Sequence, residues 1–312
     1  MSDYKYSIEA KNVNKIFYKK SKQIPALIDF SINIEKGSIH GLLGPNGAGK
    51  STFINILGGL VKKNTGYVNI CGINIDENAK LSKFKIGIVP QELNIDPFFS
   101  PVELLELQAG LYGIPKKKRR TEEILDNLKL SEQRNAYART LSGGMRRRLL
   151  IAKALVHNPE MLILDEPTAG VDIDIRSSVW SYIRKINKLG TTICLTTHYL
   201  EEAQNLCDRI SIINFGKKIT EDTKENLLNL ISLKTVSFLT DNDYDIPEIL
   251  YQFQPRKSGS KLTVQYDKNK TNLKSIIDLL NKNNINFKEI NTYESDLEDV
   301  FLKLVKSNDL SS

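Results

Sequence analysis

Apolar residues recur along the chain with two different periods, and the changes of period mark predicted strands and helices. The runs YSIEAKNVNKIFY and ALIDFSINIEKGSIHGLLG predict short strands broken at Gly37, and the second run ends in a buried strand, IHGLLG. After Thr52 the run FINILGGL changes to helical spacing. A strand, a glycine-rich loop and a helix are therefore expected in this order.

A helical block is predicted from about residue 95 to about residue 155. Ser100 is a candidate N-cap, Pro101 fits the first helical position, and Glu103 completes a capping box. Gly113 and Pro115 end this helix, and RTEEILDNLKL predicts another. We expect the block to be an insertion between strands.

Strand signals return after the helical block. The runs MLILDE and TTICLTTH are separated by the helical run RSSVWSYIRKINKLG, and this alternation predicts a parallel sheet. A last hairpin is predicted at RISIINFGKKI.

The composition changes after about Glu221. Residues 221–312 hold 12 lysines and arginines against 15 acidic residues, whereas residues 1–220 hold 32 against 22. The runs KTVSFLT and KLTVQYD predict new short strands, with a helix at NLKSIIDLLNKNN. We therefore expect two domains, 1–220 and 221–312, the second a small α+β accessory domain with a regulatory or dimer-supporting role.

The charge and hydropathy exclude several classes of protein. The net charge of +7 raises nucleic acid as a partner, but the basic run KKKRR at 116–120 lacks the interleaved aromatics of a nucleic-acid reader and predicts a solvated loop. No apolar run reaches about 18 residues and the first residues are polar, so we expect neither a membrane-spanning helix nor a secretory signal. The three cysteines have no metal-like spacing, and we expect a reducing compartment.

The segment GPNGAGKST satisfies the phosphate-loop pattern between a predicted strand and a predicted helix. Its glycines let backbone N–H groups point at phosphate oxygens, Lys50 reaches the β- and γ-phosphates, and the Ser51 hydroxyl can bind Mg²⁺. ATP or GTP is the expected ligand. The predicted nucleotide-binding residues of this segment are Gly44, Pro45, Asn46, Gly47, Ala48, Gly49, Lys50, Ser51 and Thr52.

Two carboxylates end the apolar run MLILDEP. An acid at the end of a buried strand is costly unless a cation compensates it, so Asp165 is a candidate Mg²⁺ ligand. Glu166 would then face the γ-phosphate and polarise the attacking water. The alternative is that both are turn or helix-capping carboxylates.

A second glycine turn stands at LSGGMRRRL. Ser142 can cap the following helix, and with the N–H groups of Gly143 and Gly144 it forms a second candidate anion site. Arg146, Arg147 and Arg148 fan out around that helix, and we expect them to be solvated or ion-paired, with Met145, Leu149, Ala152 and Leu155 or Val156 on the buried face.

The segments GPNGAGKST, LSGGM, LILDEPTAGVD and TTHYLEEA, in this order and spacing, resemble the ATP-binding subunit of ABC transporters over about residues 5–220. The resemblance implies a P-loop NTPase core of the α/β class, with an antiparallel β subdomain and a helical insertion, that binds and hydrolyses ATP with Mg²⁺. Within this fold the small C-terminal α+β domain is an addition.

The resemblance also assigns roles to single residues. It implies that Gln91 contacts Mg²⁺ and that His198 is a catalytic residue which hydrogen-bonds the γ-phosphate. It also implies that Asp172 lies in a loop crossing between subunits. The family's usual residues in that loop differ mildly from those here, Ala169, Gly170 and Val171. An aromatic in the first strand pair should stack on adenine, which contributes about 1 to 3 kcal/mol per base. Phe17 is the first candidate and Tyr18 its rival, the alternative being that Phe17 is part of the core.

The resemblance finally implies an assembly. The turn of Ser142, Gly143 and Gly144 closes over an ATP held by the Lys50 loop of another subunit, so the partner is a second copy of the chain. A separately encoded membrane permease is the other expected partner, with the chain cytoplasmic and peripheral on the inner face of the membrane; nucleic acid is not expected. GGM and the tail LEDVFL are similar to exporter ATPases. An importer subunit and a soluble ABC ATPase without a permease are the alternatives, and the tail can also be a plain amphipathic helix.

Overall fold

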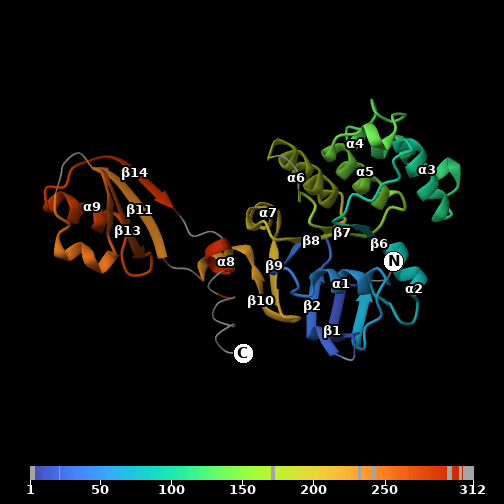
Figure 1. Ribbon diagram of the computed structural model, residues 1–312, viewed down its shortest axis with the longest axis horizontal. Coiled ribbons are helices and arrows are strands. Elements are labelled where there is room, and N and C mark those ends of the chain that lie inside the picture. The colour runs from blue at the N-terminus through green and yellow to red at the C-terminus, as the bar shows by residue number, and fades with distance from the viewer. Residues whose placement is uncertain are drawn as a thin grey trace. The chain divides into compact units, whose positions relative to one another are not determined.

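The computed structural model describes residues 4–20, 22–169, 173–230, 233–240, 244–293, 297–301 and 304. The chain divides into two compact units, one ending at Thr223 and the other beginning at Lys224 (Figure 1). Each unit has its own sheets and its own hydrophobic core.

The first unit contains two sheets. A four-stranded antiparallel sheet has the order β2-β1-β4-β5, and a six-stranded sheet has the order β10-β9-β3-β8-β7-β6. In the larger sheet every neighbouring pair is parallel except β9 and β10. The strands are β1 (Tyr6–Lys19), β2 (Lys22–Glu35), β3 (Ile39–Leu43), β4 (Thr65–Ile70), β5 (Ile73–Asn74), β6 (Ile86–Val89), β7 (Met161–Asp165), β8 (Thr192–Thr197), β9 (Arg209–Asn214) and β10 (Lys217–Thr223).

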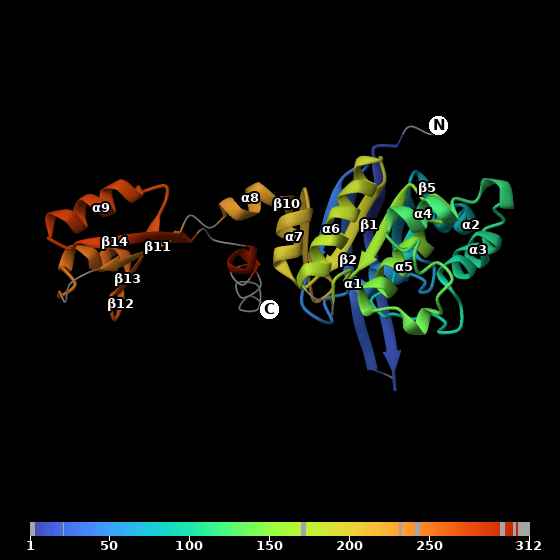
Figure 2. The same ribbon diagram turned by 90° about the horizontal axis from the view of Figure 1, so that it is seen from above.

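Helices connect these strands, and three of them form the insertion. Figures 1 and 2 both show α3, α4 and α5 gathered together, in the stretch of chain between β6 and β7. The helices of this unit are α1 (Lys50–Leu57), α2 (Ala79–Lys85), α3 (Pro101–Leu111), α4 (Thr121–Asn127), α5 (Gly143–Leu155), α6 (Ile173–Lys188) and α7 (Leu200–Leu206), with 3₁₀ turns at Lys116–Lys118 and Ala138–Thr140. None of the described helices combines the length and hydropathy that a bilayer crossing requires.

The burial of the strands explains why the sequence forms these two kinds of sheet. All residues of β3 and β8 are buried, as parallel strands covered by helices on both faces require. One core joins the two sheets through α1, where the ring of Phe53 meets that of Phe30 edge-on at 4.9 Å. The phosphate loop between β3 and α1 is thereby fixed to both sheets.

Several local predictions are confirmed. Ser100 caps α3 with the complete capping box and Pro101 at its start. The predicted last hairpin is β9 and β10, whose turn places Phe215 and Gly216 at φ of 45° and 75°, the combination of a type I′ turn.

The prediction that the first strands are short is wrong. Both β1 and β2 have 14 residues, and they pair along their whole length with several shifts of register. Asn12 and Asp29, at φ of 49° and 45°, supply the irregular backbone at these bulges, and the Asn14 side chain bonds Asp29 across the pair. The bulges interrupt the alternation from which strand length is read.

The second unit is a four-stranded antiparallel sheet, order β12-β13-β11-β14, with a helix packed on it. Val236, Phe238, Leu262 and Val264 of the sheet share a core with Ile276 and Leu280 of the helix. Its elements are α8 (Lys224–Asn229), β11 (Leu233–Thr240), a 3₁₀ turn at Glu248–Phe253, β12 (Arg256–Ser258), β13 (Lys261–Asp267), α9 (Leu273–Lys282) and β14 (Phe287–Tyr293). The tail LEDVFL lies partly outside the described residues.

Candidate functional site

The phosphate loop requires its glycines for two different reasons. Gly47 and Gly49 have φ of 80° and 111°, in the left-handed region that side chains other than hydrogen disfavour. At Gly44 the backbone is ordinary, but a Cβ would lie 2.3 Å from the carbonyl oxygen of Ile213 in β9. The loop is therefore packed tightly against the sheet while its tip, Asn46 and Gly47, stays exposed.

Lys50 begins α1 and is turned back onto the loop. Its Nζ donates to the carbonyl oxygens of Gly44 at 2.7 Å and Pro45 at 3.1 Å, and only 6% of the residue is exposed. Burial lowers the pKa of the Lys50 ammonium, and the carboxylates of Glu166 and Asp165 oppose that shift. The ammonium thus lies between the loop and the acidic end of β7, where it can donate to phosphate oxygens instead of carbonyls.

Asp165 ends β7 and is held by the neighbouring strand. The hydroxyl of Thr196 in β8 donates to its carboxylate. Burial raises the pKa of Asp165, and this hydrogen bond lowers it. The carboxylate is therefore oriented and incompletely compensated, which favours an added cation.

Glu166 follows in a left-handed backbone conformation, φ 49°, which is rare for a residue with a side chain. Its N–H donates to the carbonyl oxygen of Thr196 at 3.0 Å, which holds this turn in place. Only 6% of the residue is exposed. The turn directs the carboxylate away from the strand and toward two other loops.

Those loops supply Gln91 and His198, so three of the predicted residues come together. Gln91 follows β6, and its Nε2 donates to Oε2 of Glu166 at 2.9 Å. His198 follows β8, and its Nδ1 lies 3.2 Å from Oε1 of Glu166. Because β6, β7 and β8 are adjacent and parallel, their carboxyl ends meet at one edge of the sheet.

The second glycine turn does not join this cluster. Ser142 accepts a hydrogen bond from the N–H of Met145 at 3.3 Å and so caps α5, as the sequence predicts, while Gly143 faces open space. Across the described ranges of the chain, no hydrogen bond or ion pair links Ser142, Gly143 or Gly144 to the phosphate loop. Asp172 lies outside the described residues.

Comparison with known proteins identifies the family. The family model described as ABC transporter matches residues 27–169. Linearmycin resistance ATP-binding protein LnrL of Bacillus subtilis (strain 168) is 39% identical over 235 residues, which are 75% of this chain and 74% of that protein. The chain belongs to the family of ABC transporter ATP-binding proteins.

Other known proteins are similar to this chain as well. Nod factor export ATP-binding protein I of Cupriavidus pinatubonensis (strain JMP 134 / LMG 1197) is 40% identical over 203 residues, 64% of this chain and 62% of that protein. A solved dimeric ATP-binding cassette in a post-hydrolysis state, bound to ADP and Pi, matches 69% of this chain and 98% of its own with 30% identity and a TM-score of 0.62.

This ABC ATPase therefore binds and hydrolyses ATP, and the predicted fold class is confirmed. The predicted fold comprises a P-loop core, an antiparallel subdomain, a helical insertion and a small α+β addition. The structure contains each of these parts.

The candidate adenine-stacking residues lie near the end of β1 in this ABC ATPase. Phe17 is 39% exposed and Tyr18 is 68% exposed, so neither is buried in the core. The Nζ of Lys15 lies 4.8 Å from the centroid of the Phe17 ring. Both side chains remain candidates for stacking, with Phe17 the first.

The expectation that all three arginines after the glycine turn are solvated or ion-paired is wrong for Arg147. This residue is only 2% exposed, and its guanidinium donates to the backbone carbonyl oxygens of Pro90 and Gln91. Of the expected buried face, Leu149, Ala152 and Val156 are buried. Helical periodicity missed Arg147 because its partners are carbonyl groups 57 and 56 residues away in the sequence.

Glu202 on α7 was also missed, although it stands in the motif TTHYLEEA. It is 0% exposed, and its Oε1 accepts hydrogen bonds from the hydroxyl of Thr168 at 3.0 Å and from Nε1 of Trp180 at 3.1 Å. Thr168 and Trp180 bracket the segment that contains Asp172. Glu202 therefore ties both ends of that segment to the helix that follows His198.

At neutral pH we expect Glu202→Gln to raise the Tm of the nucleotide-free protein. Burial raises the pKa of Glu202, so the proton it binds stabilises the fold below the ordinary carboxyl pKa of about 4.3. That stabilisation is lost as the pH rises through the raised pKa of the folded state. Glutamine keeps an oxygen for Thr168 and Trp180 but cannot become charged.

The measurement is Tm against pH by calorimetry. The Tm difference, variant minus wild type, should grow as the pH rises from about 5 to about 8. Glu201→Gln, an exposed neighbour on the same helix, is the control and should show no such trend. A Tm difference for Glu202→Gln that does not change with pH would contradict the prediction.

Proposed function

We propose that the chain is the ATPase subunit of an ABC exporter, in which two copies close around two MgATP and drive a separate membrane permease. The observation that supports this best is the carboxylate of Glu166 between Gln91 and His198. This cluster stands beside Asp165 and the Lys50 loop, so a base, an orienting amide and a phosphate-binding cation converge on one edge of the sheet. In this proposal residues 1–220 form the ABC domain, with its helical subdomain at about 95–155, and residues 221–312 form an accessory domain.

Hydrolysis would proceed by attack of a water oxygen on the γ-phosphorus. Glu166 accepts the proton of that water, the bond between the γ-phosphorus and the β,γ-bridging oxygen breaks, and ADP and phosphate leave. Lys50 and His198 donate hydrogen bonds to the γ-phosphate oxygens and so stabilise their charge. Each carboxylate oxygen of Glu166 has one such neighbour, Gln91 or His198, and keeps a second lone pair with which it can accept a hydrogen bond from the attacking water.

Mg²⁺ fits the residues beside the phosphate loop. Ser51, Gln91 and Asp165 offer a hydroxyl, an amide oxygen and a carboxylate, the oxygen ligands that this ion prefers. Among the described residues no cluster of three or more His, Cys, Asp or Glu could hold a metal by itself. Such a site suits Mg²⁺, which uses one or two protein ligands together with phosphates and water. When bound, the ion neutralises charge on the phosphate oxygens.

The second copy would complete each ATP site. The turn of Ser142, Gly143 and Gly144 presents N–H groups at the start of α5, and Gly143 faces open space. An anion site at this end is favoured by the helix dipole. We assign it to the γ-phosphate of the ATP held by the partner's loop, with Asp172 crossing beside it, and a related cassette is dimeric.

The exporter assignment rests on the relatives. They are named linearmycin resistance and Nod factor export ATP-binding proteins, and the matches cover 74% and 62% of their lengths. The permease would hold the chain at the inner face of the cell membrane. An importer permease or no permease at all would be the alternative outcomes of a co-purification experiment.

We assign the permease contact to the insertion and the neighbouring α2. Figures 1 and 2 show α2 beside α3, and the ring of Phe84 on α2 meets that of Tyr112 at the end of α3 at 5.3 Å. Exposed apolar side chains gather on these elements; they are Leu81, Phe84, Leu107 and Leu111. Exposed apolar groups of this kind mark protein contacts more often than isolated ones do.

Glu166→Gln should keep ATP binding but lower kcat by about 10² to 10⁴, the range of a general base. The glutamine retains the shape and hydrogen-bonding capacity of the side chain but cannot accept the proton. ATP-bound dimer should accumulate, which size-exclusion chromatography with light scattering would detect. Hydrolysis at the wild-type rate would remove Glu166 from this role.

Mixing Ser142→Arg with Lys50→Ala tests whether the sites are shared. Each variant alone should be inactive, whereas a mixed dimer has one intact site made of Lys50 from one copy and Ser142 from the other. A 1:1 mixture should recover about a quarter of the wild-type rate, because about half of the dimers are mixed and each has one of two sites. If the mixture stays inactive while Ser142→Arg still binds nucleotide, the shared site is contradicted.

Leu111→Glu should abolish co-purification of the permease with the tagged chain, while ATP binding is unchanged. A carboxylate at the centre of an apolar contact would lose its hydration without gaining a partner. Leu189→Glu is the matched control, since both leucines are 76% exposed and Leu189 directly follows α6, outside α2 and α3. Equal loss with both variants, or loss with neither, would contradict the assignment of this surface.

A further inference from the structure

Arg147 occupies a position between the start of α5 and the Gln91 loop. Its Nη1 donates to the carbonyl oxygen of Pro90 at 2.8 Å, and its Nη2 donates to that of Gln91 at 3.0 Å. Two parallel hydrogen bonds from one planar guanidinium fix both the distance and the orientation of the accepting peptides. The backbone that carries Gln91 is thereby attached to α5.

The surroundings of Arg147 are acidic. Burial lowers the pKa of its guanidinium, and the charges that act against that shift come from Glu202, Asp165 and Glu166, in that order. Glu202 lies on α7, Asp165 ends β7, and Glu166 is the proposed base. The cation of Arg147 therefore contributes to the electrostatic field at the proposed ATP site, although its hydrogen bonds go to Pro90 and Gln91 and not to the phosphate loop.

The hydrogen bonds form a continuous path from one half of the proposed ATP site to the other. Ser142 caps α5, and Arg147 of the next turn holds the carbonyl group of Gln91. The side chain of Gln91 donates to Glu166, which lies beside His198. A displacement of α5 therefore moves the amide that contacts the base.

We propose that Arg147 is a positioning residue for hydrolysis, which holds the Gln91 loop to α5 so that the position of the Gln91 amide at Glu166 follows the position of the Ser142 turn. The proposal rests on the proposed function, in which Glu166 is the base and the Ser142 turn belongs to the partner's site. It adds a connection, within one chain, between the Glu166 cluster of one proposed ATP site and the Ser142 turn of the other.

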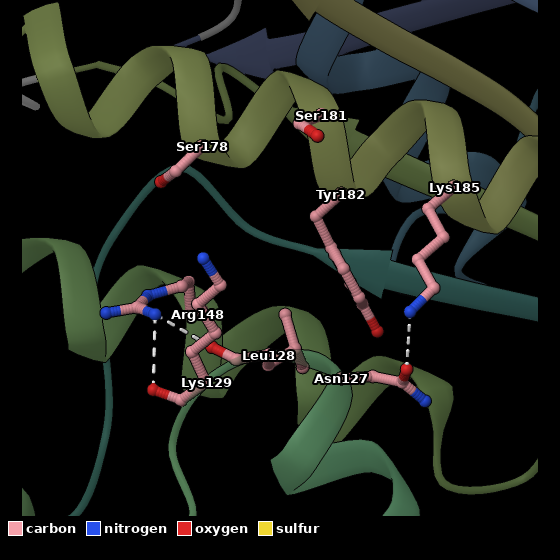
Figure 3. A pocket seen from close by; sticks show the side chains of 8 residues that line it. All are labelled: Asn127, Leu128, Lys129, Arg148, Ser178, Ser181, Tyr182 and Lys185. Carbon is pink, nitrogen blue, oxygen red and sulfur yellow. Dashed lines mark hydrogen bonds between the residues drawn. The ribbon is translucent and has the colours of Figure 1, made fainter.

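The next residue of the same helix offers a matched control. Arg148 is also partly buried, and its Nη1 donates to two consecutive backbone carbonyl oxygens, those of Leu128 at 2.8 Å and Lys129 at 3.2 Å. Figure 3 shows this contact beside a cavity of about 200 Å³ between α6 and the end of α4, which no residue of the phosphate loop lines. Arg148 thus also donates to two consecutive carbonyl groups, through one nitrogen instead of two, without reaching Gln91.

The test compares Arg147→Met with Arg148→Met in the full-length chain. We expect Arg147→Met to lower kcat by about tenfold to a hundredfold, the cost of a small misplacement in an active site, with the KM for ATP changed less than about twofold. Arg148→Met, which loses the same charge and the same number of accepting carbonyl groups, should keep kcat within about twofold. Arg147→Lys should stay impaired, because one ammonium cannot reproduce the two parallel hydrogen bonds.

A double-mutant cycle with Gln91→Ala separates positioning from a general loss of structure. If Arg147 acts through the Gln91 side chain, Arg147→Met should change kcat by less than about twofold in the Gln91→Ala background. Additive losses would overturn the proposal, as would equal losses in Arg147→Met and Arg148→Met. Arg147→Gln, which can still donate to one carbonyl group, replaces Arg147→Met in the same cycle if that variant does not fold.

The failure of this proposal and that of the proposed function give different results. Unchanged hydrolysis in Glu166→Gln would remove the base and with it the proposed function. Slow hydrolysis in Glu166→Gln together with additive effects of Arg147→Met and Gln91→Ala would remove only the connection through Arg147.

Discussion

The two consecutive carboxylates at the carboxyl end of β7, those of Asp165 and Glu166, must be compensated by other groups of the first unit. Neither acid can stand at the end of a buried parallel strand without compensation, because burial disfavours its charged form. The Thr196 hydroxyl donates to Asp165, and the Gln91 amide and the His198 ring contact Glu166. The buried cations Lys50 and Arg147 lie nearby. In the proposed function the same groups, apart from Thr196, serve phosphoryl transfer, so folding and the proposed function favour one arrangement.

The backbone of the parallel sheet fixes most of this arrangement. Gln91, Glu166 and His198 follow β6, β7 and β8, three neighbouring strands whose ends are fixed by their ladders. Only the direction of each side chain remains to be set locally, and at Glu166 a left-handed backbone sets it. A strained residue held by a hydrogen bond to Thr196 is more precisely directed than one on a free loop.

The parts of the fold that follow from local rules could be predicted from the sequence. The capping box at Ser100, the I′ turn at Phe215 and Gly216, and the fully apolar core strands each depend on residues close in the chain. Strand length failed where bulges at Asn12 and Asp29 break the alternation. In the second unit β14 was missed because FKEINTY is almost wholly exposed and carries little hydrophobic signal.

The candidate site also contains residues that could be predicted from the sequence and residues that could not. The resemblance to the ABC family implied that Gln91 and His198 lie at the Mg²⁺ and γ-phosphate that Glu166 faces. The structure brings the three residues together, while their catalytic roles stay predictions. Arg147 and Glu202 could not be found by periodicity, because a charged residue is assigned to the solvent face unless its distant partners are known.

The burial of Arg147 has a mechanical consequence that an exposed arginine could not have. An ion pair at the surface is flexible and weak, so it transmits little displacement from one element to another. A guanidinium that donates to two adjacent carbonyl groups in the interior must move with them or leave them without donors, which is costly. In the proposed mechanism, helix α5 and the Gln91 loop are therefore joined firmly enough to respond together when ATP and a second copy act on the Ser142 turn. The cost of burying one cation is offset by the carboxylates of Glu202, Asp165 and Glu166.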